Sequence, residues 1–117
     1  MILVDTSIWV DHLRSGNPYL VAWLGAEEVL VHPFVIGELA CGELRRREEI
    51  LALLTSMPDA SLAAHDEVMA LVESYKLFAR GIGWLDAHLL ASARLSGARL
   101  ATLDKPLARA ARALGVR

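Results

Sequence analysis

The sequence predicts an α/β fold in three layers, with a short central parallel sheet between two layers of helices. Short apolar runs typical of buried strands recur along the 117 residues, and longer segments with helical spacing of apolar residues separate them. Strands that alternate with helices in this way form parallel sheets covered on both faces. The length suits a single domain over residues 1–117.

The first part of the chain contains two predicted strands and two predicted helices. Residues 2–4 are an apolar, partly β-branched strand that ends at an aspartate. A threonine and a serine then provide N-cap candidates for a helix over residues 8–14, which a serine and a glycine end. Residues 18–24 begin with a proline, which the first turn of a helix tolerates. Residues 29–31 are the second apolar strand.

The middle of the chain is mainly helical. A proline starts a helix over residues 33–44, and residues 45–54 continue as a further helix. Residues 61–63 are a weak third strand after a Pro-Asp turn. Residues 65–79 carry an apolar stripe at helical spacing and predict an amphipathic helix.

The last part of the chain contains two helices and one strand. A glycine-containing loop precedes a helix over residues 84–95, which Ser-Gly closes. Residues 99–103 are an apolar strand, and residues 106–114 form the last helix after a proline-containing start.

The composition excludes several classes of protein. Hydrophobic residues make up 55% and charged residues 22%, which excludes a disordered chain. No apolar run approaches the roughly 18 residues that a transmembrane helix needs, and no signal peptide is visible. Cys41 is the only cysteine, so no internal disulfide can form, and we expect it to be a small core residue of a helix. We therefore expect a cytoplasmic protein with no membrane association.

Four carboxylates lie within or beside apolar runs: Asp5, Glu38, Asp86 and Asp104. A lone buried carboxylate is costly, and neighbouring carboxylates repel one another, so we expect them to surround a cation. Asp5 and Asp104 follow predicted strands, and the carboxyl ends of parallel strands form binding sites. Glu38 and Asp86 share helix faces with apolar or small residues, which predicts that both point inward.

Each of these carboxylates also has an ordinary structural explanation. Asp86 fits an acid in the first turn of a helix, where the helix dipole favours it. Asp104 fits a turn at the start of a helix, and Asp5 fits a helix cap. Glu38 fits a core charge with a partner. An interpretation in which all four carboxylates are purely structural is weaker than one in which they surround a cation.

Carboxylate oxygens are hard ligands suited to Mg²⁺ or Mn²⁺, and such ions activate water for attack on phosphodiesters. The sequence contains no serine-nucleophile elbow, no Cys-x-x-Cys pair, no H-E-x-x-H and no phosphate-binding glycine loop. The four histidines lack the spacing of metal ligands, so a zinc site is not expected.

Four segments in order resemble the PIN-domain family, with the greatest similarity to the VapC-type toxins of bacterial toxin–antitoxin pairs. They are DTSIW at 5–9, VIGELACG at 35–42, GWLDAHLLASAR at 83–94 and LATLDKPLARAARALG at 100–115. The resemblance implies a ribonuclease that depends on Mg²⁺ or Mn²⁺, acts on RNA, pairs with a cognate antitoxin that blocks its site with a basic side chain, and forms a homodimer.

Carried over by position, the resemblance implies that Asp5, Asp86 and Asp104 bind metal. Glu38 completes the catalytic set by binding metal or orienting the attacking water. The hydroxyl after the first aspartate corresponds to Thr6 or Ser7, with Ser7 the better match, and the threonine before the last aspartate corresponds to Thr102, which supports the site from the same side of its strand.

The basic residues concentrate near the C-terminus, although the net charge of the chain is −2. Lys105, Arg109 and Arg112 share one face of the last predicted helix beside Asp104, which makes them candidates for contacts with RNA phosphates or simply a solvated face. Two apolar stripes exceed what a small core needs and fit either the core or a homodimer interface. The stripes are Trp9, Leu13, Leu20 and Trp23, and Ile50, Leu51, Leu53 and Leu54.

The chain departs from the family pattern in two places. Leu107 stands where relatives often have an aromatic residue, and the usual last strand is minimal or absent.

Two other functions fit part of the pattern. A magnesium-dependent phosphoryl-transfer or phosphatase domain also places aspartates at strand ends, but phosphatases of the D-x-D type need an acid where this chain has Ser7. A catalytically silent PIN-fold binding module would not need an intact set of acids.

Overall fold

The computed structural model describes all residues, Met1–Arg117, and its centre is a three-stranded parallel sheet. The strands are β1 (Ile2–Val4), β2 (Val29–Leu30) and β3 (Arg99–Ala101), in the order β2–β1–β3. Leu3 of β1 pairs with Leu30 on one side and with Leu100 on the other. The predicted α/β class with a short parallel sheet is confirmed, and β1, which lies at the centre, carries the first of the candidate aspartates at its end.

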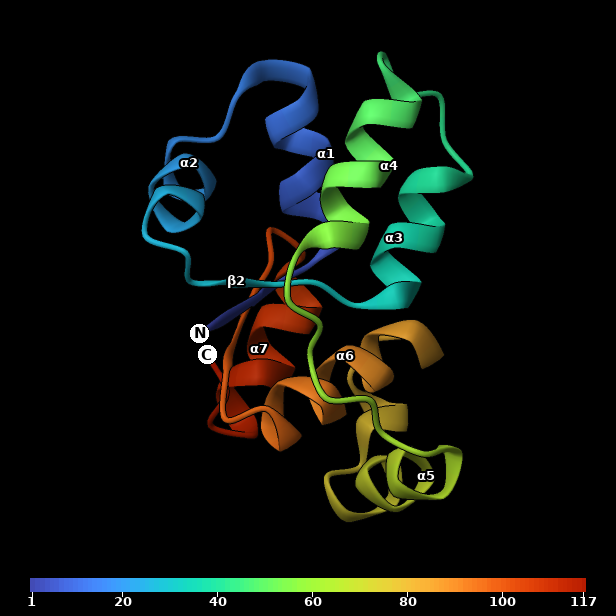
Figure 1. Cartoon of the computed structure of the whole chain (residues 1–117). Coiled ribbons are helices and arrows are strands. Elements are labelled where there is room, and N and C mark those ends of the chain that lie inside the picture. Colours follow the sequence, from blue (N-terminus) through green and yellow to red (C-terminus); the bar gives the residue numbers. More distant parts are fainter.

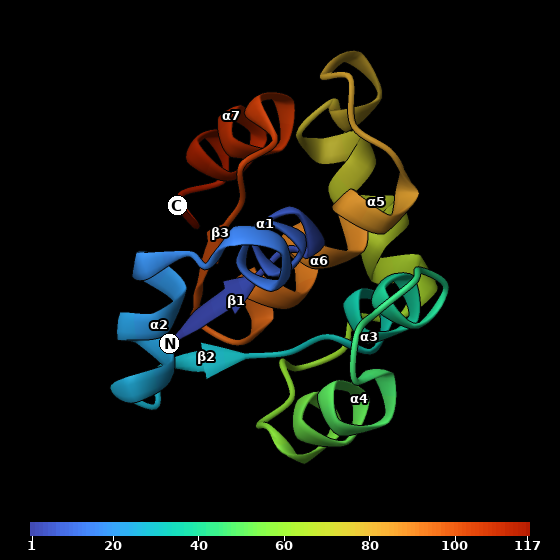
Figure 2. The same ribbon diagram turned by 90° about the horizontal axis from the view of Figure 1, so that it is seen from above.

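Helices cover both faces of this sheet (Figure 1). Helices α1 to α4 lie on one face, while α6 and α7 lie on the other and α5 packs against α6 at the periphery. Viewed from above, α1 lies over β1 (Figure 2). The helices are α1 (Thr6–Ser15), α2 (Pro18–Gly25), α3 (Pro33–Ala40), α4 (Arg47–Ser56), α5 (His65–Ser74), the 3₁₀-helix η1 (Leu77–Ala79), α6 (Trp84–Leu95) and α7 (Lys105–Ala113).

The core runs through the sheet and along α6. All three residues of β1 are buried, and α6 is buried continuously from Ala87 to Ala93. Full burial of one leucine contributes about 1.5–3 kcal/mol, so this contiguous core supplies the rigidity on which a site at the strand ends depends. Trp9, Leu20 and Leu54 are also buried, so the stripes on α1, α2 and α4 contribute mainly to the core. No helix combines the length and apolar character needed to cross a lipid bilayer.

The prediction of a strand at residues 61–63 is wrong. The chain instead makes a single parallel bridge from Val31 to Asp59, with the N–H of Ala60 donating to the carbonyl of Val31 at 2.8 Å. The next N–H, of Ser61, donates to the side-chain hydroxyl of Ser96 at 2.8 Å. The next pair would need the N–H of residue 33, but Pro33 has none and begins α3, so the ladder stops after one pair.

Two helices end earlier than predicted. The predicted helix over residues 65–79 is broken at Lys76, whose φ is 51°, into α5 and η1. The predicted helix over residues 33–44 ends at Ala40, and Arg46 with φ 53° precedes α4. Gly42 directly follows the C-cap of α3, whereas no glycine marks the break at Lys76. Non-glycine residues rarely adopt the left-handed conformation that Lys76 and Arg46 have.

Cys41 is exposed at the C-cap of α3, so the expectation of a buried core cysteine is wrong. The predicted loss of a last strand is confirmed: no strand follows α7, and the N–H of Leu100 donates to the carbonyl of Val116 as the one remnant of pairing. Leu107 is fully buried, so the leucine that replaces the family's aromatic residue still fills the core.

Candidate active site

Asp5 lies where β1 passes into α1 and is buried, with 6% of its surface exposed. It occupies the N-cap position of α1, but its side chain caps no helical N–H. Its Oδ2 accepts two hydroxyl hydrogens instead, from Ser7 Oγ at 2.8 Å and from Thr102 Oγ1 at 2.7 Å. An aspartate at this position ordinarily accepts from the helix backbone. Here the carboxylate is turned toward β3, and its Oδ1 takes no hydrogen bond from the protein.

The two hydroxyls that hold Asp5 are themselves fixed by the backbone of the segment after β3. The N–H of Leu103 donates to Ser7 Oγ at 3.0 Å, and the N–H of Asp104 donates to Thr102 Oγ1 at 3.0 Å. Each hydroxyl therefore accepts one backbone hydrogen and donates its own to the carboxylate, an arrangement that strengthens both bonds. This network joins the carboxyl ends of β1 and β3.

Asp104 comes next to this network and is half-buried at the N-cap of α7. Its side chain forms no capping hydrogen bond, so it is not committed to the helix start. The alternative explanation of Asp104 as a structural cap is therefore weakened, since its carboxylate is left available for a ligand.

Glu38 lies on an exposed face of α3, so the prediction that it points inward is wrong. The buried residues of this helix are Val35 and Leu39, whereas Glu38 faces solvent. Its Oε1 accepts the hydroxyl hydrogen of Thr6 at 2.9 Å. Thr6 directly follows Asp5, so this bond ties α3 to the start of α1 and brings Glu38 to the mouth of the site. Sequence reasoning placed Thr6 second to Ser7 and had no signal for its bond to a helix 32 residues away.

Asp86 is half-buried in the first turn of α6, where its Oδ2 accepts the N–H of Gly83 at 3.4 Å. The ordinary role of a first-turn acid therefore applies, but it is not the whole environment. Burial raises the pKa of Asp86, the Gly83 bond opposes this, and the charges of Asp5, Asp104 and Glu38 raise the pKa further. Because Asp5, Asp104 and Glu38 all act on Asp86, the four predicted acids share one region.

A divalent cation fits the chemistry of this cluster, because carboxylate oxygens are its preferred ligands and their mutual repulsion is relieved by positive charge. However, no three carboxylate, imidazole or thiol side chains lie close enough to hold one ion directly. Asp5, Asp86 and Asp104 are therefore not a ready-made set of direct ligands. Mg²⁺ typically binds one or two carboxylates and keeps several waters, so water would complete the contacts to the remaining acids.

We expect Asp86→Asn to stabilise the metal-free protein at pH 7 while lowering metal-dependent activity about a hundredfold or more. The raised pKa means that ionisation of Asp86 costs folding stability above the pKa of the unfolded chain, and asparagine removes this cost. Urea unfolding in EDTA at pH 7 should show a higher midpoint for the variant, and that gain should vanish near pH 4. A lower midpoint at pH 7 would contradict this electrostatic account.

We expect Thr102→Val to destabilise the protein by about 1 kcal/mol, because the part-buried N–H of Asp104 loses its acceptor. The same change should weaken metal binding about 10–100-fold, since Asp5 loses a group that orients it. Urea unfolding and calorimetric Mn²⁺ titration measure the two effects. Thr55→Val is the matched control, since its hydroxyl bonds only a carbonyl within exposed α4. Equal metal affinity in wild type and Thr102→Val would show that the network does not orient Asp5.

The predicted RNA-contact residues lie on α7, beyond Asp104. Lys105, Arg109 and Arg112 are exposed, whereas the opposite face of α7 buries Leu107 and Ala111. The basic face thus starts beside the carboxylates and continues along the helix.

The structure also shows a row of touching rings, which the sequence did not reveal, with neighbouring ring centroids 4.7–5.0 Å apart. In order these rings are His32, Phe34, His88, Trp84 and His65.

Comparison with known proteins gives consistent results. Residues 2–113 match the family model described as PIN domain. The chain is 47% identical over 117 residues to Ribonuclease VapC32 of Mycobacterium tuberculosis, from strains CDC 1551 / Oshkosh and ATCC 25618 / H37Rv, and the match covers 99% of this chain and 94% of that protein. The crystal structure of FitAcB from Neisseria gonorrhoeae is similar in fold, with a TM-score of 0.66, 24% identity, and coverage of 96% of this chain and 94% of the other.

Proposed function

Since the chain belongs to the PIN-domain family, we propose that it is a metal-dependent endoribonuclease, the toxin of a type II toxin–antitoxin pair. The observation that carries the proposal is the group of four carboxylates in which the charges of Asp5, Asp104 and Glu38 raise the pKa of Asp86, and in which two hydroxyls hold the Asp5 carboxylate. The 47% identity to a ribonuclease over the whole chain supports the same activity. We take residues 1–117 as one nuclease domain and place its action on RNA in the cytoplasm.

In this proposal, Asp5, Asp86 and Asp104 hold Mg²⁺ or Mn²⁺. The bound ion supplies charge stabilisation for the phosphodiester and lowers the pKa of a water molecule. Ser7 and Thr102 keep the Asp5 carboxylate in one orientation, so the protein pays no reorganisation cost during the reaction. Glu38 stands at the mouth, next to the Thr6 hydroxyl, and accepts the proton of the attacking water. The water oxygen forms a bond to phosphorus as the bond to one ribose oxygen breaks.

The same charges define the partners that we propose. Lys105, Arg109 and Arg112 hold RNA phosphates along α7, where attraction of a polyanion is strongest at low salt. A cognate antitoxin inhibits by placing a basic side chain among these carboxylates, whose mutual repulsion raises the pKa of Asp86. A homodimer would cover part of the exposed apolar surface, which includes Leu53 at 56% exposure.

Incubation of the purified chain with total RNA and Mn²⁺, followed by mapping of the cut ends, tests the activity. We expect discrete internal cuts that disappear when EDTA is added. RNA that remains intact with both Mg²⁺ and Mn²⁺, or cuts that persist in EDTA, would contradict a metal-dependent endoribonuclease.

A further inference from the structure

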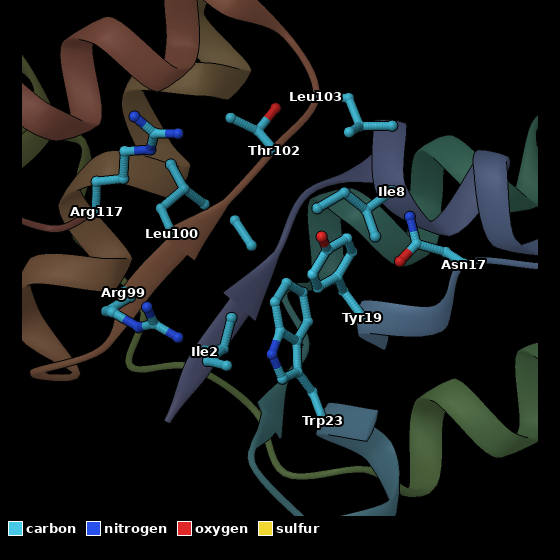
Figure 3. A pocket seen from close by; sticks show the side chains of 11 residues that line it. Ile2, Ile8, Asn17, Tyr19, Trp23, Arg99, Leu100, Thr102, Leu103 and Arg117 are labelled. Carbon is cyan, nitrogen blue, oxygen red and sulfur yellow. The ribbon is translucent and has the colours of Figure 1, made fainter. Parts of the chain in front are cut away.

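A cavity of about 320 Å³ lies between α2 and β3, beside the candidate active site (Figure 3). Tyr19 and Trp23 of α2 form one wall, and Ile2 of β1 lies at the base. The side chains of Arg99 and Arg117 lie on the opposite side, along β3. Strand β3 lies at the edge of the sheet, and its residues Arg99, Leu100 and Ala101 all line the cavity.

This cavity is joined to the carboxylate site through two residues that line both. Thr102 lines the cavity and donates its hydroxyl hydrogen to Asp5 Oδ2 at 2.7 Å. Leu103 also lines the cavity, and its N–H donates to Ser7 Oγ at 3.0 Å. The cavity therefore begins one hydrogen bond away from the Asp5 carboxylate, and a chain-like substrate at the carboxylates would extend directly over it.

The charge of the lining selects for an anion. Arg99 and Arg117 line the cavity, and no aspartate or glutamate side chain does. The cavity between α1 and α3 differs, since Glu38 and Glu43 line it together with Arg14 and Arg45. An acidic ligand would thus be attracted to the cavity beside β3. In the cavity beside α3, the positive and negative charges of the lining nearly cancel.

The aromatic wall selects for a flat ring. The rings of Tyr19 and Trp23 have centroids 6.3 Å apart and are tilted by 37°. Tyr19 is 70% exposed and forms no side-chain hydrogen bond within the protein, and Trp23 is half-buried, so ring surface is available to a ligand. Single-stranded RNA is bound by stacking of unpaired bases on such rings, together with arginine contacts to the backbone. The volume lies at the lower end of the range for ligand cavities, which suits one nucleotide.

We propose that this cavity binds one unpaired nucleotide adjacent to the scissile phosphodiester. The base stacks on Tyr19 and Trp23, and Arg99 with Arg117 contacts the phosphate that leads away from the carboxylates. This inference rests on the proposed ribonuclease function and adds to it a subsite that holds one unpaired base beside the cut. A base paired in a duplex cannot leave its stack to enter the cavity without an energetic cost.

The test measures binding of fluorescein-labelled single-stranded RNA hexamers of uridine and of adenosine by anisotropy, in EDTA, where no cleavage occurs. Tyr19→Ala is expected to weaken binding of at least one hexamer about 5- to 100-fold, the effect of losing a stacked base. Arg99→Gln should weaken binding about fivefold and reduce its salt dependence. Phe78→Ala and Arg80→Gln, at an exposed aromatic and an exposed arginine outside the cavity, are matched controls that should bind like wild type.

A second readout locates the base. Hexamer binding should quench tryptophan fluorescence in wild type and in Trp84→Phe, and much less in Trp23→Phe, which keeps an aromatic wall. Hexamer affinity that is unchanged in both Tyr19→Ala and Arg99→Gln would overturn the proposal. If these two variants lost antitoxin binding but kept RNA binding, the cavity would be assigned to the antitoxin and the proposal would also be overturned. Failure of the ribonuclease function is distinguishable, because wild type would then make no metal-dependent cuts whatever its affinity in EDTA.

Discussion

Replacement of Asp5 by asparagine is expected to lower metal-dependent RNA cleavage at least about a thousandfold, because the several kilocalories of charge stabilisation that a bound cation supplies are lost. Asparagine has nearly the same shape as aspartate, and its carbonyl oxygen can still accept the hydroxyl hydrogens of Ser7 and Thr102. The fold should therefore persist. Single-turnover cleavage of a labelled RNA at saturating Mn²⁺ measures the effect, and circular dichroism checks the fold.

The matched control for this change is Asp66→Asn, which removes a carboxylate from an exposed position in the first turn of α5. It should leave the cleavage rate within about twofold, since surface changes away from a site have small effects. Asp5→Asn with wild-type activity would remove the basis for assigning the reaction to this carboxylate cluster.

His32 is expected to make the protein lose up to about 3 kcal/mol of stability as the pH falls from 6.5 to about 4. This histidine is 2% exposed, and its Nδ1 accepts the N–H of Phe34 at the start of α3. Burial lowers the pKa of His32 to about 4, the charge of His88 lowers it as well, and Asp59 opposes both. The unfolded chain takes up a proton near pH 6.5 that the folded chain refuses until about pH 4, so stability declines within this window.

Protonation of His32 would also turn its Nδ1 from an acceptor into a donor and break the cap of α3, the helix that carries Glu38. His32→Asn supplies a cap without a titrating group, so urea unfolding between pH 7 and pH 4 should show a flatter profile. His65→Asn, at an exposed position, is the control and should keep the wild-type slope. An unchanged slope in His32→Asn would assign the acid sensitivity to other groups.

The parts of the fold that the sequence predicted well are those with strong local signals. Strand β1 and helix α6 match the predicted residues, because a buried apolar run and a helix between glycines leave little choice. The break at Lys76 could not be predicted, because non-glycine residues rarely adopt the left-handed conformation that this residue has.

In the candidate site, too, the residues with a clear local signal were predicted well and the others were not. Asp5 and Asp104 were predicted from their positions after strands, which parallel topology brings to one edge. The orientation of Glu38 was mispredicted, because the spacing of apolar residues did not show that only Val35 and Leu39 of α3 reach the core. The aromatic and arginine walls of the cavity beside β3 come from segments about 80 residues apart, and their proximity depends on how α2 packs against the sheet.

Calorimetric titration of the wild-type chain with Mn²⁺ at pH 7 tests most directly the central claim, that these acids jointly hold a divalent cation. We predict saturable binding that weakens at least about tenfold in both Asp5→Asn and Asp86→Asn, in line with the loss of groups that bind or orient a metal. An absence of saturable binding, or equal affinity in wild type and both variants, would contradict the claim.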